Sequence, residues 1–183
     1  LLCNAHTAVN NSQIAFLHAF RWGTTILPGQ EITLERLLDQ TAITYPNTYV
    51  RELLGSEIKD LLEDVADNLF NPDPYYQQGG DMVRSGGIRY TLSPSASIGS
   101  RISNLTLSDG TKINPDKRYR VSGWASTSEN NSGAPIWEIV SDYLNHFGVI
   151  NIQKTYLPDL AHIKQNPGIS CLLYTSPSPR DRG

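Results

Sequence analysis

The chain has 183 residues, of which 39% are hydrophobic and 18% are charged, and its formal net charge is -3. This length is typical of one domain with or without a short appendage, and the composition is that of an ordinary globular protein. The slight negative charge and the lack of a Lys/Arg run disfavour a nucleic-acid partner, and no apolar stretch is long enough to cross a bilayer. Two cysteines, and four histidines without metal-site spacing, predict neither a disulfide framework nor a metal site.

Both ends of the chain carry unusual sequence. The start, Leu1-Leu2-Cys3-Asn4, has neither an initiator Met nor a signal-peptide pattern, so we expect it to come from inside a longer protein. Residues 171–183 have no periodicity and resemble the translated read-through of a sequencing adaptor. We therefore expect one domain at 1–170 and a non-native tail at 171–183; a genuine Ser-Pro linker to another domain is the alternative.

Hydrophobic periodicity predicts short, mixed elements in the first third of the chain. We expect the end of a helix at residues 1–10 and a short buried strand at 13–17. Thr33 is a good N-cap for a short amphipathic helix that follows it. A strand is predicted at 47–54, where apolar and polar residues alternate up to a Gly-Ser pair.

The clearest helix of the chain follows that pair. Ser56 is expected to cap it, and apolar residues recur at helical spacing as far as Leu69. The acidic residues between them, including Glu63 and Asp67, invite a metal-site interpretation, but most fall away from the apolar stripe, so we predict a solvated face. Residues 71–80 hold too many prolines and glycines for a regular element.

The second half is predicted to contain more strands than helices. Residues 81–92 indicate a strand interrupted by Gly86-Gly87, which is typical of a bulge or of a close approach to the backbone. Because strands and helices mix without regular strand–helix alternation, the predicted fold class is α+β. The other predicted elements are a hairpin of 101–107 and 111–113, strands at 118–123 and 149–152, and a helix that opens at 133–135 and ends at Gly148.

The stretch Phe20–Gln30 is the candidate binding motif. It places Arg21, Trp22 and Gly23 side by side, ahead of two threonines and a Pro-Gly turn. A guanidinium can hold a tetrahedral oxyanion through two hydrogen bonds, and glycine lets the backbone approach a ligand closely. The alternative is a structural arginine stacked on Trp22, which is a common arrangement.

Irregular stretches of the chain resemble one family, the C-terminal domain of SoxB proteins, which are the thiosulfohydrolase branch of the 5'-nucleotidase family. The loop 71–84 and Gly123-Trp124-Ala125 match that branch rather than nucleotidases in general. The resemblance extends over nearly all of residues 1–170 and implies a layered α/β/β/α arrangement. The stretches that carry it are 20–30, the loop 41–46 with the helix ending Val65-Ala66-Asp67-Asn68-Leu69-Phe70, and 75–87.

The resemblance implies that the chain is one of two cooperating parts. An N-terminal metallophosphatase-like domain would hold two manganese ions and the activated water, while this chain would recognise the substrate and contribute no catalytic residue or metal ligand. The substrate would be a cysteine S-thiosulfonate on a SoxY-type sulfur carrier protein, in the periplasm. The chain alone is then expected to be inactive.

The resemblance also implies roles for individual residues. Arg21, with Trp22 and Gly23 beside it, sits where nucleotidases place an arginine that contacts the substrate phosphate; in SoxB proteins the matching anion would be the terminal sulfonate. Arg84, Gly86 and Gly87 lie where the family has a second substrate-lining strand. Trp137 lies near a family aromatic that stacks on adenine, although a core position on its helix is the favoured interpretation.

Two departures from the family pattern bear on these roles. The nucleotidase motif Gly-Gly-Asp-Gly-Phe is replaced here by Asn131–Trp137, which disfavours a bound base and favours a substrate other than a nucleotide. SoxB proteins generally carry Ser-Pro-Gly before the Phe-Arg-Trp-Gly segment, whereas this chain has Leu17-His18-Ala19. Loss of a Pro-Gly pair changes the backbone conformations allowed there, and with them the orientation of Arg21.

Three functions therefore compete. The leading hypothesis is the substrate-recognition domain of a SoxB-like thiosulfohydrolase. The second is the same domain of a 5'-nucleotidase or related metallophosphoesterase. The third is a non-catalytic binding module in which Arg21 and Trp22 are structural, so that Arg21→Ala would weaken folding and leave anion binding unchanged.

Overall fold

The computed structural model describes residues 1–18, 25–124, 133–151 and 156–161. Within these ranges no helix is both long and apolar enough to cross a membrane. The helices are α1 (Leu2–Val9), α2 (Leu34–Thr41), α3 (Gly55–Phe70) and α4 (Ile136–Phe147), with a 3-10 turn at Pro74–Tyr76. The strands are β1 (Ile14–Leu17), β2 (Thr48–Leu54), β3 (Arg84–Gly86), β4 (Ile88–Leu92), β5 (Ile102–Leu107), β6 (Arg118–Trp124) and β7 (Asp159–Leu160).

The strands form two sheets. The first has the order β2-β6-β1-β3, in which β1 and β6 are parallel and the outer strands run antiparallel to their neighbours. The second has the order β5-β4-β7, with β5 antiparallel and β7 parallel to β4. Sequence-distant segments are therefore brought together in both sheets, because β1 pairs with β6 and β4 pairs with β7.

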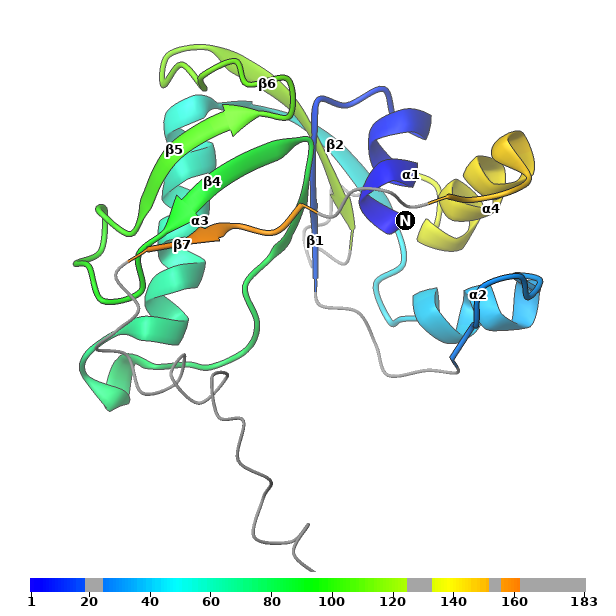
Figure 1. Ribbon diagram of the computed structural model, residues 1–183, viewed down its shortest axis with the longest axis horizontal. Helices are drawn as coiled ribbons and strands as arrows, with labels where there is room; N and C mark the ends of the chain where they lie inside the picture. The colour runs from blue at the N-terminus through cyan, green and yellow to red at the C-terminus, as the bar shows by residue number, and fades with distance from the viewer. Residues whose placement is uncertain (19–24, 125–132, 152–155, 162–183) are drawn as a thin grey trace, which may run out of the picture.

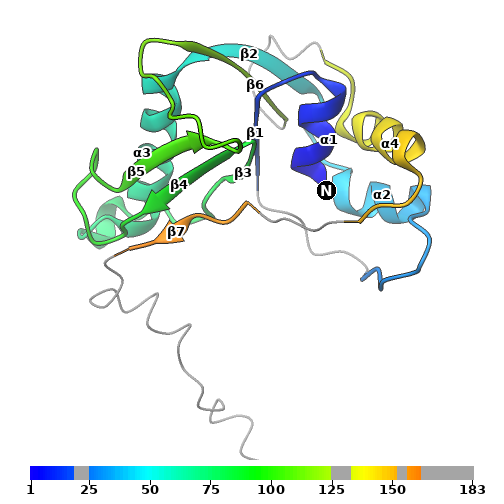
Figure 2. The ribbon, with the colours of Figure 1, turned by 45° about the horizontal axis from the view of Figure 1, so that its top comes forward.

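Two apolar cores lie on opposite faces of the four-stranded sheet. Alternate residues of β1 supply both, since Ile14 and Phe16 face one core and Leu17 faces the other. The inter-sheet core joins β1 and β6 to α3, β4 and β5, and the helical core joins the same two strands to α1, α2 and α4. Figures 1 and 2 show α1, α2 and α4 on one side of this sheet and α3 with the second sheet on the other. The predicted α+β class is confirmed.

The predicted strand at 81–92 is two strands that belong to different sheets. The chain leaves β3 and enters β4 at Gly87, whose φ of 78° lies in the left-handed region that favours glycine. A Cβ atom on Gly87 would lie 2.0 Å from the carbonyl oxygen of Gln13. The glycine therefore permits both the change of direction and the close contact with the chain before β1.

The start of α3 differs from the prediction. The helix begins at Gly55 directly after β2, so Ser56 is inside the first turn and is not its N-cap. The Glu57 carboxylate instead accepts a hydrogen bond of 2.6 Å from the Leu54 N–H. The Gly55 and Ser56 N–H groups donate to the backbone carbonyls of residues 117 and 115. These carbonyls, from a distant part of the chain, take the place of a side-chain cap.

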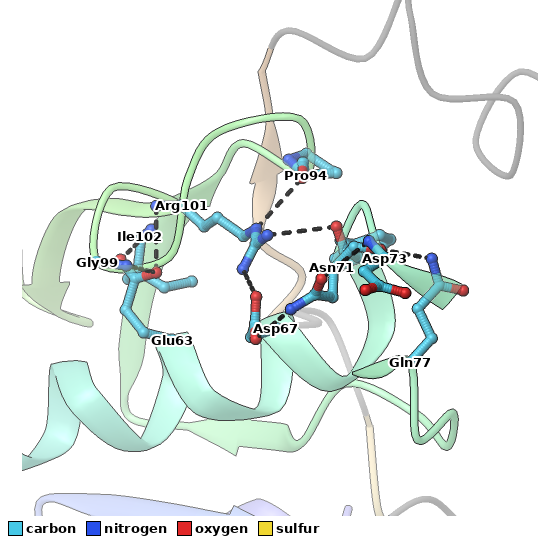
Figure 3. A network of polar contacts seen from close by, with 10 residues as sticks. Glu63, Asp67, Asn71, Asp73, Gln77, Pro94, Gly99, Arg101 and Ile102 are labelled. Atoms are coloured by element: carbon cyan, nitrogen blue, oxygen red, sulfur yellow. Dashed lines mark hydrogen bonds and ion pairs between the residues drawn. The ribbon is translucent and has the colours of Figure 1, made fainter. Parts of the chain in front are cut away.

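The predicted solvated face of α3 is wrong at Glu63. This side chain is buried, with 3% of its surface exposed. Its carboxylate accepts hydrogen bonds from the backbone N–H groups of Gly99, Arg101 and Ile102, at 2.9, 3.2 and 2.8 Å (Figure 3). Asp67, one turn later, is half-buried and forms an ion pair with the buried Arg101. These carboxylates fix the β4–β5 connection against α3.

Most other predicted elements are present, with two exceptions. Residues 111–113, the second arm of the predicted hairpin, form no strand, and Lys112 pairs with Thr106 in an isolated bridge. Thr33 caps α2, its hydroxyl accepting a hydrogen bond from the Arg36 N–H, and Gly148 ends α4 with a φ of 65°. The sequence predicts a last strand at 149–152, but the described residues of that range form no strand, and Val149 is 89% exposed. The strand near this end is β7, which is only two residues long and carries no periodicity.

Candidate functional site

Of the candidate residues that the structure describes, Arg84 lies at one edge of the four-stranded sheet. The parallel strands β1 and β6 end there at Leu17 and Trp124, and the antiparallel β3 and β2 begin there at Arg84 and Thr48. We call this edge, defined by these four residues, the carboxyl edge. In open α/β sheets ligands bind outside the carboxyl ends of the strands, where loops diverge from a rigid support.

Arg84 occupies the first position of β3 at this edge. It pairs in register with Leu17, its side chain is exposed, and its Nη1 donates a hydrogen bond of 3.0 Å to the Met82 carbonyl. Burial raises the pKa of the Tyr90 hydroxyl, while a hydrogen bond with Ser85 and the positive charge of Arg84 oppose that rise. The guanidinium is thus a cation at the sheet edge that its own loop holds in orientation, and it can bind an oxyanion through two N–H groups.

The structure does not bring Gly86 and Gly87 to the carboxyl edge. Gly86 pairs with Ala15, and Gly87 lies against Gln13 at the other end of β1. A Cβ atom on Gly86 would lie 2.5 Å from the Cβ of Cys3 in α1. The expected close approach to the backbone is therefore present, and it is made by this protein's own chain. A substrate contact at these glycines stays a prediction.

Trp137 lies in the first turn of α4, which is tied to the carboxyl edge by β2. Thr48 donates to the Ala134 carbonyl through its N–H at 3.1 Å and its hydroxyl at 2.8 Å. The Ile136 N–H donates to the Pro46 carbonyl at 2.9 Å. The Trp137 ring is half-buried and packs against the helical core, as the core interpretation expects.

Arg21, Trp22 and Gly23 lie outside the described residues. The structure describes the residues that lead to them. Strand β1 ends at the buried Leu17, and the exposed His18 follows it at the carboxyl edge. Leu17, which departs from the SoxB pattern, is part of the helical core and pairs with Arg84. The stretch Phe20–Gln30, which holds Arg21, thus begins three residues after Leu17, the partner of Arg84.

Sequence reasoning missed Thr48 as a residue of this edge. Its signal was weak: a hydroxyl at the first position of a strand, just after an X-Pro pair. The described ranges contain no group of three His, Cys, Asp or Glu side chains that could hold a metal ion.

Comparisons with known proteins place the chain in a family. Residues 1–138 match the family described as 5'-nucleotidase, C-terminal domain. The structure of the Thermus thermophilus sulfate thiohydrolase SoxB is similar to it with a TM-score of 0.76 and 36% identity, over 86% of this chain and 30% of that one.

Two nucleotidase structures share the fold at lower identity. A 5'-nucleotidase of Staphylococcus aureus matches with a TM-score of 0.67 and 13% identity, over 87% of this chain and 35% of that one. A 5'-nucleotidase precursor of Thermus thermophilus matches at 0.64 and 17%, over 87% and 34%. The chain spans about a third of the length of these hydrolases. It belongs to the family of 5'-nucleotidase C-terminal domains.

Proposed function

We propose that the chain is the substrate-recognition domain of a SoxB-like thiosulfohydrolase. The observation that carries the proposal is the position of Arg84 at the carboxyl edge, paired with the residue from which the chain leads into the Arg21 segment. Arg84 on β3 and Arg21, which follows β1 in the sequence, would give one anionic group two bidentate partners. The 36% identity to a sulfate thiohydrolase supports a sulfonate as that group.

The proposed reaction is hydrolysis of a cysteine S-thiosulfonate on a carrier protein. Water attacks the sulfonate sulfur, a new S–O bond forms, and the S–S bond breaks. Its electron pair stays with the carrier's sulfur, which takes up one of the two protons of the water, and sulfate leaves with release of the other proton. Nothing is oxidised or reduced by an outside reagent. Arg84 and Arg21 would hold the sulfonate oxygens and stabilise the negative charge that develops on them.

The remaining parts of the proposed enzyme lie outside this chain. We infer a preceding metallophosphatase-like domain with two manganese ions, a SoxY-type carrier protein and a periplasmic location, all implied by the resemblance. This chain's own contribution is to bind and orient the substrate, and chemistry that needs the metal ions belongs to the other domain. One of the similar structures is that of a 5'-nucleotidase precursor, which supports an exported protein.

A nucleotidase is the second candidate, because two nucleotidase structures share the fold. Its base-binding motif Gly-Gly-Asp-Gly-Phe is absent from residues 131–137. Trp137, the aromatic nearest that motif, packs half-buried on the helical core and has less face to offer a base. Both features favour the sulfonate substrate.

Turnover by the longer protein that contains this chain and its metal domain tests the proposal. We expect manganese-dependent release of sulfate from an S-thiosulfonated SoxY-type carrier, and little release of phosphate from AMP. Residues 1–170 alone with added manganese are expected to hydrolyse neither. Phosphate release without sulfate release would establish the nucleotidase instead, and turnover by the isolated chain would contradict the division of labour between the two domains.

A further inference from the structure

The strand that carries Arg84, β3, is short and lies at the edge of its sheet. It has three residues, and among the described strands its neighbour in the sheet is β1 alone. Three register pairs join the two strands. So few backbone contacts allow an edge strand to shift or open locally unless side chains hold it as well. The position of Arg84 therefore depends on the side-chain contacts of β3 and of the residues beside it.

Packing holds the chain on both sides of β3. At the end remote from Arg84, Gly86 packs closely against α1 and Gly87 against the chain before β1. Before the strand, Met82 and Val83 are half-buried and pack against the inter-sheet core. These contacts fix where the strand enters and leaves the sheet. The residue next to Arg84 within the strand is held in another way.

This residue, Ser85, ties β3 to the second sheet. It pairs with Phe16, so both side chains point to the inter-sheet core. There a hydrogen bond joins the Ser85 side chain to the hydroxyl of Tyr90 on β4. Ser85 is 6% exposed and Tyr90 is 3% exposed. Because the chain changes sheets between these two residues, the bond links the first sheet to the second beside Arg84.

Packing alone does not explain the hydroxyl of Tyr90. Apart from Tyr119, the other buried members of the inter-sheet core have apolar side chains. A phenylalanine would fill the same space without burying a polar group, which costs free energy. A buried pair of polar groups can instead select one arrangement of the elements that carry it.

The same hydroxyl lies within electrostatic range of the Arg84 guanidinium. Burial raises the pKa of Tyr90, and the hydrogen bond with Ser85 and the positive charge of Arg84 oppose that rise. The guanidinium also donates to the Met82 carbonyl at 3.0 Å, so it is held close to the chain that enters β3. The pair of Ser85 and Tyr90 therefore lies beside the group whose orientation matters at the carboxyl edge.

We propose that Tyr90 is a positioning residue, which fixes the start of β3 through Ser85 and so sets where the Arg84 guanidinium lies. This inference rests on the proposed function, because it assumes that Arg84 binds the anionic group of the substrate. Tyr90 is buried and acts through Arg84, without contact with the substrate. Two hydrogen bonds from one guanidinium tolerate little displacement, since such bonds weaken steeply away from their preferred geometry.

Double substitutions in the longer, metal-loaded protein test the inference. The substrate is a Gly-Gly-Cys-Gly-Gly peptide with an S-thiosulfonated cysteine, and the measured quantity is kcat/KM for release of sulfate. Tyr90→Phe and Ser85→Ala should each lower kcat/KM about tenfold while Arg84 is present. In an Arg84→Ala background each should change kcat/KM by less than about twofold, because no guanidinium remains to be displaced.

Tyr119→Phe is the matched control for the loss of a buried hydroxyl. Tyr119 belongs to the same core, is 2% exposed, and accepts a hydrogen bond of 2.9 Å from the Asn114 N–H. It lies near the start of β6, about 17 Å along the strand from Trp124 at the carboxyl edge. Tyr119→Phe should lower the urea midpoint about as much as Tyr90→Phe and leave kcat/KM within about twofold.

The outcomes separate this inference from the proposed function. If Arg84→Ala lowers kcat/KM while Tyr90→Phe lowers it no more than Tyr119→Phe does, the positioning role is overturned and the proposed function stands. An equal loss from Tyr90→Phe with and without Arg84 would also overturn it, because Tyr90 would then act independently of the guanidinium. Ser85→Ala allows the same comparison if Tyr90→Phe does not fold. Unchanged kcat/KM in Arg84→Ala would reject the proposed role of Arg84, and the inference with it.

Discussion

At the scale of single residues, Glu63 shows how a buried charge can organise a loop. Burial raises the pKa of this carboxyl group, but hydrogen bonds from the Ile102 N–H, the Lys59 ammonium and the Gly99 and Arg101 N–H groups outweigh burial and hold the pKa below its usual value. The charged form is therefore the one that the fold stabilises. These donors would be buried without a partner if the acceptor were lost.

Glu63→Gln is expected to lower the free energy of unfolding by about 2 kcal/mol or more, because one of the two charged acceptor oxygens becomes an amide. Urea denaturation at neutral pH measures the change. Asp64→Asn, at the exposed next position, is the matched control and should change stability by less than about 0.5 kcal/mol. Equal effects of the two substitutions would contradict the structural role given to Glu63.

Because His6 is buried, we expect the free energy of unfolding to fall at mildly acidic pH. Burial lowers its pKa from 6.5 to about 4, so it is neutral in the folded state. As pH falls below 6.5 the unfolded chain takes up the proton first, and stability falls until the pH reaches about 4. The expected loss is about 3 kcal/mol. Denaturation at several pH values should give a flatter profile for His6→Gln, whereas the exposed His146→Gln should keep the wild-type slope.

At the scale of elements, the passage from β3 to β4 determines how the two sheets are joined. One short stretch of chain supplies an edge strand to the first sheet and the central strand of the second, and Gly87 lies between them. The backbone of residue 13 packs against this glycine. If a substitution of Gly87 lowered activity, impaired folding would therefore be the first explanation, ahead of a lost contact with the substrate.

Gly87→Ala is expected to destabilise the fold by about 3 kcal/mol or more, since a methyl group there combines a positive φ with a backbone clash. Gly99→Ala separates the two effects, because Gly99 has a φ of 85° and nothing within 4 Å of an added Cβ. That control should cost only about 1 kcal/mol. Thermal or urea unfolding measures both variants, and similar losses would exclude the clash as the main cause.

Local patterns predict elements well where the information lies within the element. The apolar spacing of α3 and α4, the N-cap Thr33 and the turn at Ser108-Asp109-Gly110 all report on neighbouring residues. The burial of Glu63 could not be predicted from local patterns, because its three backbone donors lie 36, 38 and 39 residues after it in the chain. β7 was missed because pairing with β4, and no sequence pattern of its own, makes it a strand.

At the scale of the whole molecule, the two cores pack on both faces of the four-stranded sheet and support its carboxyl edge. The fold family could be predicted because irregular loops carry more specific information than periodicity does, and the match over residues 1–138 confirms it. The site could be predicted only in part. The register of β1 and β3 pairs Leu17 with Arg84, and this pairing cannot be derived from the sequence pattern. The sequence therefore does not show that Arg84 and the chain leading to Arg21 lie at the same edge of the sheet.

The central claim is that Arg21 and Arg84 bind the anionic group of the substrate. Its most direct test is kcat/KM of the longer, metal-loaded protein on the thiosulfonated peptide, measured with the free energy of unfolding of each variant. Arg21→Ala and Arg84→Ala should each lower kcat/KM about 100-fold with stability nearly unchanged, and Arg89→Ala, an exposed arginine on β4, should change neither. Unchanged kcat/KM in Arg21→Ala and Arg84→Ala, together with weakened folding, would contradict the claim and make these arginines structural.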